Sequence, residues 1–199
     1  LRAKRTDLMT QVQLLGQRAK QAGKTLATAS TELKNKALEN MAQELAAASR
    51  EILQANAEDM KNARENGVAQ VMLDRLLLTE DRIVGMAKGI TDIVKLPDPI
   101  GVTLSEIKRP NGMTVKKITV PLGVIAVIYE ARPNVTSDAA ALCLKSGNAV
   151  ILRGGKEAIN SSKAIVKALR LGLEKTGLDE NCISLVTDTS RDSATELMR

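Results

Sequence analysis

Two short apolar runs, separated by a segment rich in small residues, constrain the fold of this chain most strongly. The runs are Gly123–Tyr129 and Ala149–Leu152. Both are rich in β-branched residues and lack polar alternation, which is typical of strands covered on both faces in a parallel sheet. The segment between them predicts a helix over Asp138–Lys145 that ends at Gly147. We expect this helix to pack on the sheet through Ala139, Ala140, Ala141 and Leu142. Strand, helix and strand together predict a βαβ unit.

Each of the two predicted strands is followed by a polar, cationic segment. Residues 130–134 are Glu-Ala-Arg-Pro-Asn, and residues 153–156 are Arg-Gly-Gly-Lys. In an open parallel sheet, ligands bind in the crevice outside the carboxyl ends of the strands. We therefore expect both segments to belong to the functional site.

The first hundred residues carry apolar side chains at helical spacings of three and four. Helices are predicted over Leu8–Ala22, from an N-cap at Ser30 onward, and over Arg50–Arg64, Val71–Leu77 and about 80–95. A turn is predicted at Gly23, and Thr79 is the predicted N-cap of the last of these helices. We expect the apolar stripes to be packing faces.

A β-hairpin is predicted between these helices and the βαβ unit. Val102–Arg109 and Met113–Val120 alternate apolar and polar residues on either side of Pro110-Asn111-Gly112. Asn-Gly between two alternating runs is the strongest short-range hairpin signal. A two-stranded ribbon is marginally stable alone, and this one keeps Ile107 and Ile118 on its surface. The pattern therefore favours an oligomerisation arm, and the alternative is a surface hairpin folded back on its own body.

After the βαβ unit, helix and strand continue to alternate. Ala158–Thr176 predicts a helix, Cys182–Val186 predicts a third strand, and a last helix starts near Arg191. The predicted fold class is therefore α/β, with N-terminal helices, a β-hairpin arm and an open, doubly wound parallel sheet. The Gly-x-Gly-x-x-Gly fingerprint is absent. Two glycines at 154–155 are weak evidence for a nucleotide site, because a tight connection uses them for structural reasons as well.

The composition argues against several classes of function. The net charge of +6 is spread over the chain, which has one Tyr and no Phe or Trp, whereas nucleic-acid binders concentrate basic residues and interleave aromatic ones. No apolar run is long enough to span a membrane. Two cysteines without paired spacing and the lack of a signal peptide indicate a reducing, cytoplasmic location. We expect an anionic small molecule as ligand, and no nucleic acid, membrane or metal.

Two motifs, PLGVIAVIYEARPNVT and LCLKSGNAVILRGGKEA, make the chain resemble the γ-glutamyl phosphate reductases of the aldehyde dehydrogenase superfamily. LDRLLLTEDRI and RPNGMTVKKITVPLGV extend the resemblance over essentially the whole chain. It implies NADPH-dependent reduction of L-glutamyl 5-phosphate to L-glutamate 5-semialdehyde in proline biosynthesis, with release of phosphate and a cysteine thioester as intermediate. It also implies that the chain is the N-terminal, cofactor-binding half of a longer protein.

The resemblance divides the chain into three parts. Residues 1–98 are a helical lead packed on the cofactor domain, 99–120 are the arm through which subunits associate, and 121–199 are an incomplete Rossmann-like NADP-binding sheet. The catalytic domain is expected outside this chain. The implied partners are glutamyl phosphate, further copies of the protein and a glutamate 5-kinase.

The resemblance also assigns a cofactor site. Its residues are Tyr129 and Glu130 at the end of one strand, and Arg153, Gly154, Gly155 and Lys156 after the next. The position matched by Lys156 is commonly acidic in the superfamily, where a carboxylate suits ribose hydroxyls. A lysine suits a 2′-phosphate, so Lys156 together with the guanidinium fork of Arg153 favours NADP over NAD. The alternative is a lysine that points into solvent.

Arg132 and Asn134 are the candidates for binding the anionic substrate. An asparagine of the corresponding segment donates to the oxyanion in ordinary aldehyde dehydrogenases, and alignment by the strand places Arg132 at that position. The implied substrate carries an acyl phosphate and an α-carboxylate, so we expect Arg132 to donate to an anion or oxyanion, with Asn134 as the alternate. The alternative is that Arg132 pairs with Glu130 or another acidic neighbour.

Neither cysteine is assigned a catalytic role. Cys143 lies on a predicted helix face and Cys182 begins an interior strand, and buried cysteines behave as small hydrophobic residues. The chain also has no His to act as a base. We therefore expect the chain alone to be inactive. The alternatives are a non-catalytic nucleotide-binding and self-association module of the same fold, and another member of the superfamily.

Overall fold

A three-stranded parallel sheet lies at the centre of the computed structural model, which describes residues 9–198. The strands are β3 (Val124–Ile128), β4 (Ala149–Arg153) and β5 (Ile183–Leu185), in the order β3-β4-β5. Ile125 pairs with Val150, and Val150 pairs with Ile183. Because all three strands run in one direction, their carboxyl ends meet at one edge of the sheet.

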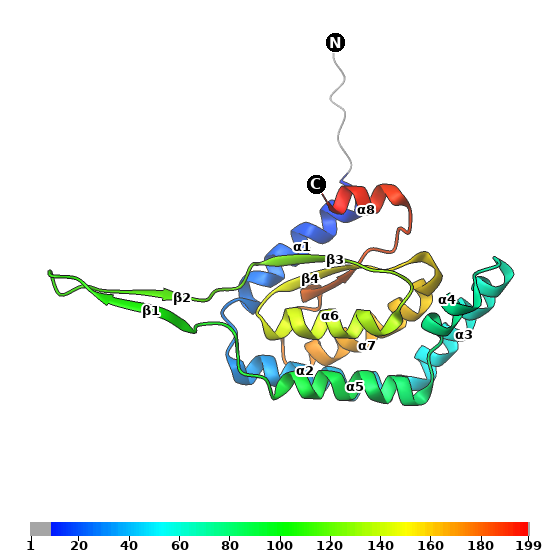
Figure 1. Cartoon of the computed structure of the whole chain (residues 1–199), viewed down its shortest axis with the longest axis horizontal. Helices are drawn as coiled ribbons and strands as arrows, with labels where there is room; N and C mark the ends of the chain where they lie inside the picture. The colour runs from blue at the N-terminus through cyan, green and yellow to red at the C-terminus, as the bar shows by residue number, and fades with distance from the viewer. Residues whose placement is uncertain (1–8, 199) are drawn as a thin grey trace, which may run out of the picture.

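Helices cover both sides of this sheet, as a doubly wound fold requires (Figure 1). On one side, α1 (Gln11–Leu26) packs mainly against β4. On the other side lie α6 (Pro133–Lys145) and α7 (Ile159–Glu174), and α2 (Thr31–Ala47) and α5 (Glu80–Val94) form a further layer beyond them. This arrangement confirms the predicted α/β class.

The remaining helical elements are α3 (Ser49–Glu65), α4 (Gln70–Leu76), α8 (Arg191–Leu197) and the short 3-10 turns η1 (Lys156–Ala158) and η2 (Glu180–Cys182). Both predicted N-caps are confirmed. Ser30 Oγ accepts a hydrogen bond from the backbone N–H of Leu33, and Thr79 Oγ1 accepts one from the N–H of Arg82, each at 3.2 Å. No helix between residues 9 and 198 is both long and apolar enough to cross a bilayer.

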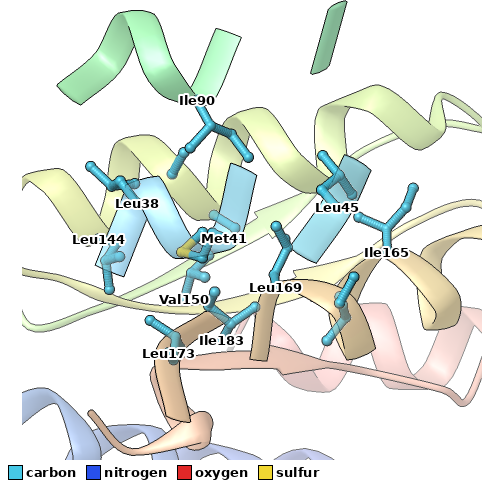
Figure 2. Packing of buried hydrophobic residues seen from close by; sticks show 14 of the residues in the cluster. Leu38, Met41, Leu45, Ile90, Leu144, Val150, Ile165, Leu169, Leu173 and Ile183 are labelled. Atoms are coloured by element: carbon cyan, nitrogen blue, oxygen red, sulfur yellow. The ribbon is translucent and has the colours of Figure 1, made fainter. Parts of the chain in front are cut away.

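The hydrophobic core lies between the sheet and the helices α2, α5, α6 and α7. Figure 2 shows side chains from all of these helices pointing toward one another, among them Leu38, Met41, Ile90, Leu144, Leu169 and Ile183 of β5. These six side chains are at most 1% exposed. Full burial of a side chain of this size contributes on the order of 1.5–3 kcal/mol.

The backbones of α2 and α7 touch where Gly172 faces Met41. A Cβ built on Gly172 would lie 2.5 Å from the backbone N of Met41 and 2.6 Å from its Cα. No side chain fits at such a distance, so only glycine permits this close crossing. The crossing sets the separation of the helices on this side of the sheet.

The predicted hairpin is confirmed as β1 (Thr103–Lys108) and β2 (Thr114–Ile118), which pair in antiparallel fashion. Its loop closes through a 2.8 Å hydrogen bond from the N–H of Arg109 to the carbonyl of Met113, with Gly112 at a φ of 84°. Every residue of both strands is exposed, and the hairpin projects away from the body (Figure 1). The alternative of a hairpin folded back on its own body is therefore wrong.

A buried ion pair anchors the base of this arm. The Nζ of Lys34, a residue only 2% exposed, lies 2.6 Å from Asp98 Oδ2, to which Thr31 Oγ1 also donates at 2.6 Å. Burial by itself raises the pKa of Asp98. The hydrogen bonds from Lys34, Thr31 and the N–H of Ile100 outweigh burial, so the net pKa is below its ordinary value.

The predicted end of the first helix is wrong. Helix α1 continues through Gly23 and ends at Leu26. Gly23 faces the sheet, where a Cβ would lie 3.6 Å from the Cβ of Ala149, so this glycine serves close packing and not a turn. The predicted start at Leu8 lies outside the described residues.

Two predictions for the βαβ helix are also wrong. α6 begins at Pro133 and not at Asp138, because proline at the first helical position has a φ that suits the helix and lacks an N–H that would go unbonded there. Leu142 is 52% exposed and therefore does not pack against the sheet as predicted.

The prediction that the first strand is covered on both faces is wrong within the described residues. Val124 and Ile128 of β3 are 36% and 44% exposed, whereas Ile125 and Val127 pack against the core. β3 is the edge strand, and α1 packs mainly on the neighbouring strand β4. One face of β3 is therefore left open.

We predict that Gly172→Ala destabilises the chain by about 3 kcal/mol, because the added methyl group must separate two helix backbones. Urea unfolding followed by circular dichroism measures this loss. Gly16→Ala in α1 is the control: a Cβ there meets nothing within 4 Å, so the exchange should be neutral or stabilise the helix by up to about 1 kcal/mol. Equal stability of the two variants would contradict a close crossing at Gly172.

Candidate functional site

The segments that follow β3 and β4 touch each other at the carboxyl edge of the sheet. A Cβ on Gly155 would lie 3.0 Å from the backbone N of Ala131, and a Cβ on Gly154 would lie 3.1 Å from Cε2 of Tyr129. A larger residue at either position would push the two segments apart. The structure thus brings the two predicted site segments together, and both glycines have a packing role in that contact.

A cavity of about 490 Å³ lies beside this contact, and we call it the loop cavity. Its polar lining residues are Tyr129, Glu130, Arg153 and Glu157. Its apolar lining residues are Val68, Met72, Leu76 and Ala131. Apolar walls with a few polar groups are typical of small-molecule sites. Carboxylates can accept hydrogen bonds from ribose hydroxyls and the apolar wall can contact a base, so this set of residues fits a nucleotide.

Tyr129 and Arg153 are both held by neighbours within the protein. The hydroxyl of Tyr129 lies 2.7 Å from Thr136 Oγ1, and burial raises the pKa of this hydroxyl. Nη2 of Arg153 donates to the carbonyls of Thr189 at 2.7 Å and Ser190 at 3.0 Å. Nε of Arg153 is buried without a hydrogen-bond partner in the described structure. The fork predicted to bind phosphate is therefore turned toward the loop after β5.

Lys156 is exposed and lies apart from the loop cavity. It begins η1 and lines a separate cavity of about 230 Å³, together with Asp59 and Asn160. The two cavities share Val68 and Glu157 as lining residues, so they adjoin. The structure therefore places Lys156 and Arg153 in neighbouring cavities and not in one.

A larger cavity of about 650 Å³ lies between α4, α5 and the start of α6, and we call it the arginine cavity. Its polar lining residues are Asp74, Arg75, Arg82, Arg132, Asn134 and Asp138. Its other lining residues are Val71, Leu77, Leu78, Gly85 and Met86. Three guanidinium groups against two carboxylates make this cavity suitable for an anionic small molecule.

Arg132 and Asn134, the two predicted anion donors, both line the arginine cavity. Arg132 is exposed at the N-cap of α6, and within residues 9–198 its side chain makes no hydrogen bond or ion pair. The alternative pairing of Arg132 with Glu130 is not observed, because Glu130 pairs with Arg75 at 3.8 Å. Asn134 Nδ2 lies 3.4 Å from Asp138 Oδ2, and burial raises the pKa of Asp138.

The two cavities lie on either side of the segment 130–132. Glu130 lines the loop cavity, Arg132 lines the arginine cavity, and the ion pair between Arg75 and Glu130 connects them. Its two side chains are 43% and 71% exposed, and such surface pairs contribute little stability. Ligands in the two cavities would therefore be separated by one short segment and a weak ion pair.

Five polar lining residues of the two cavities were not predicted from the sequence, namely Asp74, Arg75, Arg82, Asp138 and Glu157. Arg75 and Arg82 stand in LDRLLLTEDRI, which was used only for its resemblance. A pair of arginines near a predicted helix start was the available signal. In the part of the chain that the structure describes, no three His, Cys, Asp or Glu side chains are grouped as metal ligands.

Comparison with known proteins places this geometry in a family. The model of the aldehyde dehydrogenase family matches residues 6–199. A γ-glutamyl phosphate reductase of Clostridium beijerinckii is 55% identical over 191 residues, which are 96% of this chain and 46% of that protein. The chain therefore spans about half the length of the curated relatives it matches.

Crystal structures of two such reductases are also similar to the chain. The structure from Thermotoga maritima has a TM-score of 0.94 at 38% identity, and the match covers 96% of this chain and 46% of the Thermotoga chain. The structure from Saccharomyces cerevisiae has a TM-score of 0.86 at 34% identity, and the match covers 94% of this chain and 48% of the yeast chain. These findings confirm the resemblance found in the motifs, and the chain belongs to the aldehyde dehydrogenase family.

Proposed function

We propose that this chain is the cofactor-binding part of a reductase that converts L-glutamyl 5-phosphate to L-glutamate 5-semialdehyde in proline biosynthesis. The observation that carries the proposal is the pair of cavities on either side of residues 130–132, one suited to a nucleotide and one to an anion. The choice of substrate is supported by the 55% identity to a γ-glutamyl phosphate reductase.

The reaction exchanges the phosphate on the acyl carbon for a hydride. NADPH, when bound, supplies that hydride and leaves as NADP. Arg132 and Asn134 are proposed to donate hydrogen bonds to the acyl phosphate or to the oxyanion that forms when the carbonyl is attacked. The N-terminus of α6, where both residues stand, adds a partial positive charge that favours the same anions.

The loop cavity is proposed to hold the adenosine part of the cofactor. We expect Glu130 and Glu157, which line this cavity, to accept hydrogen bonds from ribose hydroxyls. Tyr129 and the glycines at 154–155 pack against each other beside it. Lys156, in the adjoining cavity, is proposed to bind the 2′-phosphate and so to favour NADP. Arg153, which lines the loop cavity, stays a predicted second donor.

We also propose a division of the chain into three functional parts. Residues 1–98 are proposed as a helical lead on the cofactor domain, residues 121–199 as the incomplete NADP-binding sheet, and residues 99–120 as an arm for association with further copies. Support for the arm comes from exposed apolar residues on a projecting ribbon, such as Leu104 and Ile107. A biosynthetic reaction of this kind and two unpaired cysteines favour the cytoplasm. Association with a glutamate 5-kinase remains part of the proposal.

Both thiols of this chain are poorly placed to act as the nucleophile. Cys143 and Cys182 are 7% and 1% exposed. Burial raises the pKa of Cys143 to about 11, and burial with a smaller contribution from Asp179 raises that of Cys182 to about 12. A nucleophilic cysteine needs a lowered pKa and access to the substrate. This observation favours, as a second candidate, a nucleotide-binding and self-association module that performs no catalysis.

We predict that neither thiol reacts with Ellman's reagent in the native chain at pH 8. With a pKa of about 11, only about one thousandth of Cys143 is thiolate at that pH. Both thiols should react within seconds in guanidinium chloride, where they are exposed. Rapid native reaction that disappears in Cys143→Ser or Cys182→Ser would contradict the burial described here.

The proposed reaction is tested in the full-length protein by following NADPH absorbance while glutamate 5-semialdehyde is oxidised in phosphate. We predict NADP-dependent turnover in the wild type and a large fall in kcat for Arg132→Lys, which keeps the charge but loses the planar fork. The affinity for NADPH should change little in this variant. An inactive wild type would refute the proposed reaction. Wild-type kinetics in the variant would show that Arg132 is not the anion donor and would leave Asn134 as the candidate.

Cofactor preference gives a separate prediction. Lys156→Glu should weaken the binding of NADPH by about tenfold to a hundredfold, as expected for the loss of one charge-assisted contact, and should leave NADH unchanged. Fluorescence titration of the full-length protein measures both affinities. The control is Lys163→Glu. Lys163 is an exposed lysine on α7 that lines neither the loop cavity nor the cavity beside Lys156. Equal losses for the two cofactors would leave Lys156 as a surface residue.

A further inference from the structure

The connection between α4 and α5 contributes the cation of Arg82 and the carboxylate of Asp74 to the lining of the arginine cavity. Nη1 of Arg82 donates to the backbone carbonyl of Asp74 at 2.9 Å and also to that of Leu77. The guanidinium is therefore held at the connection between α4 and α5, next to residue 74. The carboxylate of Asp74 accepts a hydrogen bond from Gln70 Nε2 at 3.0 Å and lines the same cavity.

The charge of Arg82 is not neutralised by an acidic side chain. Within residues 9–198 no carboxylate forms an ion pair with Arg82, whereas Arg75 pairs with Glu130. Because only Nη1 of Arg82 has backbone partners, Nη2 and Nε can bind a ligand. Arg82 is thus oriented by the backbone and keeps free donors, which is the arrangement of a bidentate carboxylate site.

The start of α6 contributes further polar groups to the cavity. Arg132 and Asn134 stand there, with Asp138 further along the helix, and Gly85 of α5 is a further lining residue. A Cβ on Gly85 would meet nothing within 4 Å, so space is open along α5. A ligand that fills the cavity would therefore meet Arg82 and Asp74 at the α4–α5 connection, and the donors Arg132 and Asn134 beside the carboxylate of Asp138 at α6.

We propose that Arg82 and Asp74 bind the α-carboxylate and the α-ammonium group of the amino-acid substrate, while Arg132 and Asn134 face its acyl phosphate. This assignment rests on the proposed function and names the residues that select an α-amino acid. A simple anion would be repelled by Asp74, whereas a zwitterionic head group uses both charges. The arginine cavity thereby distinguishes glutamyl phosphate from acyl phosphates that lack either head group.

The test is calorimetric titration of the full-length protein with three five- or four-carbon acids. L-Glutamate carries both head groups, glutarate lacks the ammonium group, and 4-aminobutanoate lacks the α-carboxylate. We expect L-glutamate to bind about tenfold or more tightly than either. Asp74→Asn should abolish the preference over glutarate, and Arg82→Gln should abolish the preference over 4-aminobutanoate.

Control variants separate recognition from structural damage. Asp81→Asn removes a neighbouring carboxylate that does not line the cavity and should leave all three affinities unchanged. Gly85→Leu should weaken all three because its side chain takes up space in the cavity that Gly85 lines, whereas Gly16→Leu in α1 should weaken none. If Arg82→Gln fails to fold, Arg82→Lys keeps the charge and should still reduce the preference for a carboxylate.

The outcomes distinguish this assignment from the proposed reaction. No preference for L-glutamate in the wild type, or equal losses for all three acids in the Asp74 and Arg82 variants, would overturn the assignment. If semialdehyde oxidation is absent but the preference depends on Asp74 and Arg82, the head-group site stands and the reaction fails. If oxidation is present but the preference is insensitive to both residues, the reaction stands and the head-group site fails.

Discussion

The close crossing of α2 and α7 at Gly172 is the constraint on which the rest of this structure depends. The backbones touch where a Cβ would lie 2.5 Å from Met41 N, and α2 also packs against α5. α5 in turn packs against α6. The crossing therefore determines how far α5 stands from the sheet, and hence the width of the arginine cavity between α5 and the start of α6.

Buried polar side chains hold α4 and the α4–α5 connection in place at the other end of this cavity. Nδ2 of Asn56 donates to the carbonyl of Leu76 at 2.9 Å and to Ser161 Oγ at 3.0 Å, and its Oδ1 accepts from the N–H of Leu78 at 2.8 Å. Asp59 accepts hydrogen bonds from the N–H and Oγ of Ser161, both at 2.7 Å. Because buried polar groups are costly unless they are bonded, these contacts tie the connection to the start of α7.

The glycines after β4 allow two neighbouring loops to pack closely. Gly154 and Gly155 pack against Tyr129 and Ala131, which closes the gap between two neighbouring loops. The same close approach creates the wall of the loop cavity and separates it from the arginine cavity by one short segment. This packing is what makes the two cavities neighbours.

The sequence by itself determined the features that depend on residues a few positions apart. Ser30 and Thr79 as N-caps, the turn at Gly112 and the order of strands and helices follow from local hydrogen bonding and apolar periodicity. The tertiary structure decided that Gly23 packs inside a helix and that, among the described residues, one face of β3 is uncovered. It also decided that Arg153 donates to the loop after β5 and that Arg82 and Arg132 line one cavity. Those features depend on contacts between segments far apart in the chain. Neither the secondary-structure propensity of a residue nor the spacing of apolar residues determines which distant segment will pack against it.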